Sequence, residues 1–166
     1  MISREYASTM ARYNRWMNGK VYAACAGLAD DERKADRGAF FGSIHRTLNH
    51  LLVGDLLWLS RFTGSSREGL HIGQPLHDSF HALRAHRDQT DAALLAFADG
   101  LTPERLRADL EITSTAHGVF SRPTWVFVSH LFNHQTHHRG QVTTLLSQLG
   151  IDIGATDLPV LPDLAG

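Results

Sequence analysis

The chain has 166 residues, of which 43% are hydrophobic and 20% charged, and its formal net charge is −1 when the histidines are neutral. These values are typical of a globular protein, and the near-neutral charge argues against a general nucleic-acid or membrane surface. A single cysteine, Cys25, excludes an intrachain disulfide. No signal-peptide core or membrane-spanning run is evident, so we expect one cytoplasmic domain over residues 1–166.

Four segments carry apolar residues at the helical spacing. They predict long helices over about residues 3–26, 42–62, 78–98 and 123–149. Ser3 fits the start of the first helix and Gly27 its end, while Pro123 and Gly150 fit the two ends of the last helix. Four amphipathic helices with few strands predict an all-α four-helix bundle. The long links permit a crossover connection, so the order of the helices stays open.

The link before the last helix has patterns of its own. Thr102 and Pro103 indicate an N-cap and the first turn of a short helix. Residues 109–115 (Asp-Leu-Glu-Ile-Thr-Ser-Thr) alternate in character and predict a short strand or hairpin. The tail after Gly150 contains two prolines and is expected to be irregular.

Four of the eleven histidines fall within nine residues of the last predicted helix. His134 and His138 are four residues apart and therefore share a helix face. His138 occupies a position of the apolar stripe where leucine is expected, and burying an unpaired imidazole costs about 1–3 kcal/mol. One metal ion would satisfy both rings; the alternative is an ordinary hydrogen bond for each. His130 lies at the edge of the stripe as a reserve ligand, and His137 faces solvent.

A metal site needs a further ligand, and the second predicted helix offers His50 at the edge of its apolar stripe. Gly54, one turn later, leaves space beside it. His45 lies away from this edge and is expected to be solvated. Asp55 lies within the stripe, where its carboxylate is expected either to contact a metal-bound histidine or to bond a neighbouring helix.

Other polar residues have two interpretations each. Asn14 lies near the inward face of the first helix, where it either fixes helix register or lines a pocket. Arg87 and Arg139 are each expected in a surface ion pair, with contact to an anionic substrate as the alternative. Cys25 is expected to be an inert buried thiol.

These residues together resemble the DinB/YfiT-like superfamily of bacterial metal-dependent enzymes over nearly the whole chain. The matching segments are residues 13–16 (Tyr-Asn-Arg-Trp), 49–52 (Asn-His-Leu-Leu), 55–58 (Asp-Leu-Leu-Trp) and 133–141 (Asn-His-Gln-Thr-His-His-Arg-Gly-Gln). The resemblance implies a four-helix bundle of unusual helix order, often dimeric. It also implies three metal ligands, His50, His134 and His138. Better-understood relatives use a divalent metal to activate a low-molecular-weight thiol, such as bacillithiol, mycothiol or glutathione.

The resulting hypothesis is a three-histidine metalloenzyme acting on a small molecule, with zinc as the first choice of ion and nickel as the alternative. Activation of a thiol predicts an S-transferase or isomerase, and activation of water predicts a hydrolase. The rival hypothesis is a non-catalytic metal- or ligand-binding module of the stress response. The pattern names no catalytic residue beyond the ligands.

Aromatic residues away from the core faces predict a symmetric homodimer with one metal site in each subunit. Trp16 lies off the main stripe of the first helix, and Trp125 lies opposite the histidine stripe of the last. The alternative is that the links and the tail cover these rings.

Overall fold

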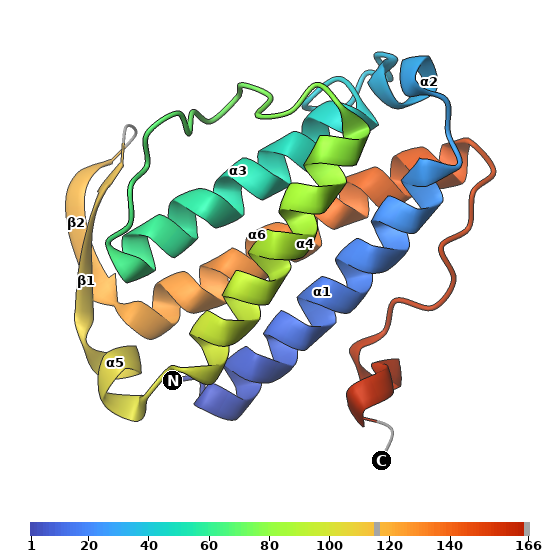
Figure 1. Cartoon of the computed structure of the whole chain (residues 1–166). Helices are drawn as coiled ribbons and strands as arrows, with labels where there is room; N and C mark the ends of the chain where they lie inside the picture. The colour runs from blue at the N-terminus through green and yellow to red at the C-terminus, as the bar shows by residue number, and fades with distance from the viewer. Residues whose placement is uncertain (115–116, 165–166) are drawn as a thin grey trace.

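The computed structural model describes residues 1–114 and 117–164, and within them four long helices form a bundle (Figure 1). These are α1 (Arg4–Ala26), α3 (Ile44–Thr63), α4 (Phe80–Asp99) and α6 (Thr124–Gln148). The links contain α2 (Asp30–Lys34), α5 (Pro103–Arg107) and a hairpin of β1 (Asp109–Ser114) and β2 (Gly118–Pro123). Two 3-10 turns, Leu158–Val160 and Pro162–Leu164, lie in the tail. The predicted all-α four-helix bundle is confirmed.

Serine side chains decide where the first three long helices begin. The hydroxyls of Ser3, Ser43 and Ser79 each accept a hydrogen bond from the backbone N–H three residues later. Such a cap contributes about 0.5–2 kcal/mol. The first start matches the prediction, whereas α3 and α4 begin two residues later than predicted, directly after their caps.

The other predicted ends differ only in detail. Thr102 caps α5 as expected, with Pro103 in its first turn. Pro123 is the last residue of β2 and the N-cap of α6, so it precedes the first turn. Gly150 follows α6 with a φ of 76°, a conformation that favours glycine. The predicted hairpin is confirmed, except that Thr115 lies outside the described residues.

The helix order contains a crossover. Helix α1 packs against α4 and α6, and α3 packs against the same two helices, so α1 and α3 lie diagonally across the bundle. The link over residues 64–79 carries the chain back to the beginning of α3, and α4 therefore runs parallel to α3 (Figure 1). Helix α6 runs antiparallel to α3 beside it. This arrangement places the two histidine-bearing helices next to each other.

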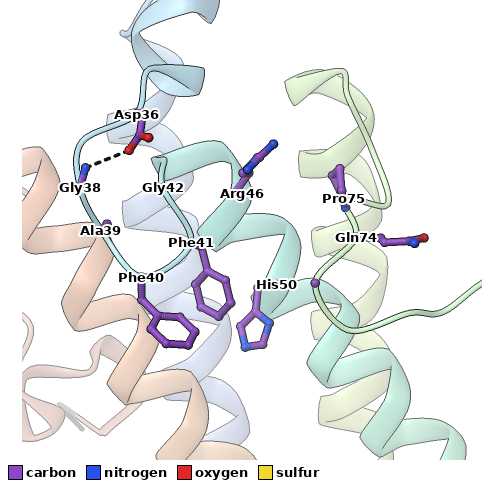
Figure 2. Close-up of a pocket in the computed structure, with 11 residues that line it drawn as sticks. Asp36, Gly38, Ala39, Phe40, Phe41, Gly42, Arg46, His50, Gln74 and Pro75 are labelled. Atoms are coloured by element: carbon purple, nitrogen blue, oxygen red, sulfur yellow. Dashed lines mark hydrogen bonds between the residues drawn. The ribbon is translucent and has the colours of Figure 1, made fainter.

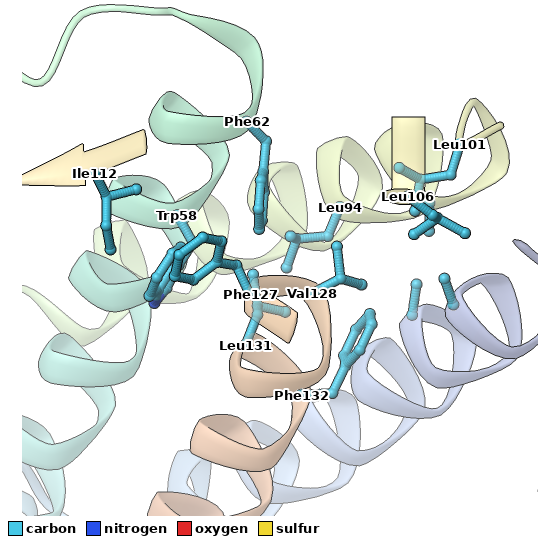
Figure 3. Close-up of a cluster of buried hydrophobic side chains, with 13 residues drawn as sticks. Trp58, Phe62, Leu94, Leu101, Leu106, Ile112, Phe127, Val128, Leu131 and Phe132 are labelled. Carbon is cyan, nitrogen blue, oxygen red and sulfur yellow. The ribbon is translucent and has the colours of Figure 1, made fainter. Parts of the chain in front are cut away.

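Two apolar clusters fill the ends of the bundle. The cluster near the hairpin is drawn in Figure 3 and contains Trp58 and Phe62 of α3 and Phe127 of α6. The rings of Trp58 and Phe127 have centroids 5.4 Å apart. Trp125 packs against the outside of this cluster. The second cluster surrounds Val21, Leu52 and Leu146 at the opposite end. No helix in the described part of the chain has an apolar stretch long enough to cross a lipid bilayer.

A buried polar layer lies between the two clusters, and all four long helices contribute to it. Arg87 of α4 contacts Asp55 of α3 (Nη1–Oδ2, 2.7 Å) and Asp91 of its own helix (Nη2–Oδ1, 3.0 Å). Arg139 of α6 donates hydrogen bonds to Asn14 and to Gln135. The prediction of surface ion pairs for Arg87 and Arg139 is therefore wrong, because both side chains are buried.

The charges of this layer balance, since it contains two guanidinium groups and two carboxylates. Burial raises the pKa of Asp55 and of Asp91, while the neighbouring Arg87 opposes that rise. Burial alone would lower the pKa of Arg87, but the two carboxylates hold it above its ordinary value. Arg87 therefore stays protonated, and its charge is what allows carboxylates to remain in the core.

Candidate metal centre

The three histidines predicted as ligands meet on adjacent faces of α3 and α6. His50, His134 and His138 each offer a ring nitrogen, and these nitrogens all lie within 4.8 Å of one another. The Nε2 atoms of His50 and His134 are 3.1 Å apart. Two nitrogens that both bind one tetrahedral zinc at about 2.0–2.1 Å lie about 3.3–3.4 Å from each other. The nitrogens are thus close enough to hold one metal ion with little movement.

Two features of the backbone bring the rings together. The four-residue spacing stacks His134 and His138 on one face of α6, and the antiparallel α3 brings His50 opposite them. Gly54 of α3 leaves space for the His134 ring, because a Cβ atom at this position would lie 3.0 Å from Cε1 of His134. The predicted space beside Gly54 is therefore occupied by His134 of the neighbouring helix.

Replacing Gly54 with alanine should raise the stability of the metal-free protein but lower its affinity for zinc. Alanine favours an interior helical position over glycine by about 1 kcal/mol. The new methyl group must, however, displace His134, so we expect zinc affinity to fall about 10- to 100-fold. Chelator competition measures the affinity, and urea unfolding of the metal-free protein measures the stability.

Gly140→Ala is the matched control for this substitution. Gly140 also lies within a helix next to the cluster, but a Cβ atom there would meet nothing within 4 Å. This variant should gain stability and keep its zinc affinity. Unchanged affinity in Gly54→Ala would show that Gly54 does not set the position of His134.

Hydrogen bonding favours the tautomer of His138 that a metal requires. Its Nδ1 lies 2.8 Å from Oε1 of Gln141, which can only accept, so Nδ1 carries the proton and the Nε2 lone pair is free. The residue spacing alone did not identify Gln141, although it lies one turn after His138 within the matching segment. The Nδ1 atoms of His50 and His134 have no hydrogen-bond partner among the described residues. A hydrogen bond between their Nε2 atoms uses the proton of one ring and the lone pair of the other. A bound metal ion would use the Nε2 lone pairs of both rings.

The cluster is shielded by an aromatic ring from the link before α3. Phe41 stacks on His50 with ring centroids 4.0 Å apart (Figure 2). It also lies edge-on to His138, with ring centroids 5.3 Å apart. Burial lowers the pKa of His50 to about 4 and that of His134 to about 3, with smaller contributions from neighbouring histidines. Burial also lowers the pKa of His138. All three rings are therefore neutral at pH 7, the form that binds metal.

These lowered pKa values predict that the metal-free protein loses stability in mild acid. An unfolded histidine titrates near its ordinary pKa of about 6.5, whereas the folded rings resist protonation. Their contribution to stability is present above pH 6.5 and is lost as the pH falls toward the folded value of about 4 for His50. Urea unfolding with a chelator at pH 7.5 and 5.0 measures the loss. We expect His134→Asn to reduce the loss, and an equal loss in both proteins would contradict the assignment.

The remaining histidines lie outside the cluster. His130 is exposed and packs edge-on against Trp58, so it is not one of the three converging rings. His137 is exposed, as expected. His45 is buried, contrary to the prediction, because its Nε2 lies 2.8 Å from the backbone oxygen of His77 in the link before α4.

The two other candidate residues lie in the polar layer. Asp55 pairs with Arg87 of α4, which is the neighbouring-helix role among its two expected roles. Asn14 donates to Asp91 at 3.3 Å and accepts from Arg139, so it joins three helices rather than contacting the histidines. The polar layer nevertheless adjoins the cluster, because Gln135 and Arg139 directly follow His134 and His138 in the chain.

Two pockets border the cluster and share His50. One has a volume of about 450 Å³ and is lined by polar and aromatic residues, including Arg46, Gln74 and Phe41 (Figure 2). The other has a volume of about 480 Å³, is mainly apolar, and also contains His134. His50 thus faces both pockets and His134 faces one of them, so the cluster has the access that a metal site with exchangeable positions requires.

The fold and the site together place the chain among helical-bundle proteins in which three histidines from two neighbouring helices could hold one metal ion. The chain belongs to the DinB family, whose model matches residues 1–165. It is 24% identical to Protein DinB of Bacillus subtilis (strain 168), over 92% of this chain and 91% of that protein. Its fold is similar to a DinB-like protein from Bacillus cereus ATCC 10987, with a TM-score of 0.64 and 22% identity over 84% of this chain and 90% of the other. The family resemblance seen in the sequence is confirmed.

Proposed function

We propose that this protein is a divalent-metal enzyme that activates a low-molecular-weight thiol for S-transfer or isomerisation. His50, His134 and His138 hold the ion, with zinc as the first choice and nickel as the alternative. The observation that supports this proposal is the convergence of three histidine ring nitrogens beside two pockets that share His50. A closed structural site would lack such access.

The chain's residues have distinct parts in this function. A divalent ion on three neutral nitrogens keeps its full charge and favours the thiolate form of a coordinated thiol. Gln141 fixes the tautomer and orientation of His138. Phe41 covers His50 and His138 and keeps water from one side of the rings, while Gly54 holds open the space for His134.

The polar pocket suits the thiol. Cellular low-molecular-weight thiols are small, hydrophilic and rich in carboxylate, amide or hydroxyl groups. Arg46 and Gln74 line this pocket (Figure 2) and offer donors for such groups. Arg46 forms no ion pair within residues 1–114 and 117–164. His50 lies at the inner wall of this pocket, where a bound thiol would reach the histidine cluster.

Cobalt substitution tests the proposal directly. Adding bacillithiol, mycothiol or glutathione to the cobalt-loaded protein should produce a thiolate-to-cobalt absorption band, and His138→Ala should abolish it. Transfer of the same thiol to monochlorobimane should depend on the three histidines. Absence of both signals with all three thiols would contradict the thiol role, and ester hydrolysis by the zinc-loaded protein would instead favour an activated-water hydrolase.

We also propose that the protein is a homodimer with one metal site in each subunit. Trp16 is half-buried and borders a hollow that it shares with Leu161 and Pro162 of the tail, and Trp125 is only partly covered by the core. Both rings retain surface for a subunit contact. Light scattering at micromolar concentration should give the mass of two chains. A monomer mass would contradict this proposal.

A further inference from the structure

The apolar pocket has the size and walls of a small-molecule site. It lies between α3, α6, the hairpin and the link over residues 64–79, and its volume is about 480 Å³. Ligand pockets in proteins are commonly about 300–1,000 Å³ and mainly apolar. Its lining includes His50 and His134, two members of the histidine cluster. A ligand bound there therefore lies against the cluster.

Aromatic rings form much of the pocket wall. Trp58 of α3 and Phe127 of α6 have ring centroids 5.4 Å apart, and Phe120 of β2 lies 6.0 Å from Phe127. All three line the pocket together with Ile112 of β1. Such a surface favours a flat aromatic or branched aliphatic body through area burial and ring packing.

Two arginines line the same pocket without acidic partners. The guanidinium of Arg61 lies 4.5 Å from the centroid of the Trp58 ring, and its Nε is buried with no hydrogen-bond partner among the described residues. Among the described residues, the Arg122 side chain donates to the backbone oxygen of its neighbour Ser121, at 2.6 Å, and lies 5.8 Å from the centroid of the Phe120 ring. No carboxylate of the described chain pairs with either arginine, and the pocket wall contains no Asp or Glu. The pocket is thus apolar with uncompensated positive charge.

We propose that this pocket binds a small organic acid with an aromatic or branched apolar body. Its carboxylate pairs with Arg61 and Arg122, because guanidinium groups match a carboxylate with two parallel hydrogen bonds. Its body packs on Trp58 and Phe127 and points its far end at His50 and His134. In the proposed function this acid is the second substrate, and the thiol binds in the polar pocket; this assignment rests on the proposed function.

Binding to the metal-free protein tests the pocket independently of the ion. The probes are 4-phenylbutyrate and 4-phenyl-1-butanol, which share an apolar body and differ in the charged end. Titrations followed by the indole NMR signal of Trp58 should show the acid binding at least about tenfold more tightly than the alcohol, as expected for hydrogen bonds to a charged group. A chelator in the buffer excludes direct contact with a metal.

Single substitutions test whether Arg61 and Arg122 bind the carboxylate of the acid. Arg61→Gln and Arg122→Gln should each weaken binding of the acid at least about fivefold and leave binding of the alcohol unchanged. Arg84→Gln is the matched control, since Arg84 is exposed on α4 and does not line the pocket. Because Arg122 is exposed, its variant should fold normally even if Arg61→Gln does not.

The outcomes separate this inference from the proposed function. Equal affinity for acid and alcohol, or full acid affinity in both arginine variants, would overturn the inference while leaving the metal function intact. A protein that binds the acid through its arginines but shows no cobalt–thiolate band would instead contradict the thiol function and leave the acid pocket standing.

Discussion

Replacing Arg87 with methionine is expected to lower the free energy of unfolding by about 3–5 kcal/mol. The substitution removes the partner of two buried carboxylates, Asp55 and Asp91, and leaves them in a core that water does not reach. A protein of this size has a total stability of about 5–15 kcal/mol, so the loss is a large part of it. Urea unfolding of the metal-free protein at pH 7.5 measures the change.

Arg84→Met on the exposed face of the same helix is the control. Because Arg84 is exposed, its replacement should change stability by no more than about 0.5 kcal/mol. If Arg87→Met also lost less than about 1 kcal/mol, the polar layer would not depend on this cation, and the charge balance described above would be wrong.

Replacing His134 with alanine is expected to weaken zinc binding by more than about 100-fold, beyond the effect of losing a supporting hydrogen bond. His134 lies centrally in the cluster, with its Nε2 3.1 Å from that of His50 and its ring centroid 4.4 Å from that of His138. Two remaining histidines leave an incomplete ligand set for a structural or catalytic zinc. Competition with a chromophoric chelator measures the affinity.

The exposed His137 provides the control for this experiment. It lies in the same helix, three residues later, but outside the cluster. His137→Ala should keep wild-type zinc affinity. Similar losses in both variants would indicate nonspecific binding to a histidine-rich segment, and no loss in His134→Ala would remove His134 from the ligand set.

The local features of this fold follow from the sequence. Three of the four long helices begin at serine caps, and all four lie within two residues of their predicted bounds, because capping and apolar spacing are properties of short segments. The meeting of His50 with His134 and His138 was also predictable, since two polar rings on one apolar face need a common partner. Helix α2 was not predicted because it has only five residues and buries none of them.

The features that depend on helix order could not be predicted in the same way. Arg87 and Arg139 resemble surface residues in their own helices. Arg87 meets Asp55 because the crossover places α4 beside α3, and Arg139 meets Asn14 because α6 packs against α1. His45 is buried for the same reason, because its partner belongs to a link that returns along α3. Gly54 has a similar explanation, because the absence of a side chain there leaves space for the His134 ring of α6. Such contacts join segments far apart in the chain.

The metal content of untagged protein from its native host tests the central claim most directly. Native mass spectrometry should show one divalent ion, zinc in the first instance, for each chain. The variant with His50, His134 and His138 all replaced by alanine should carry none while keeping the helical signal of the wild type. Wild-type protein purified without any divalent ion, or a triple variant that retains it in full, would contradict the account.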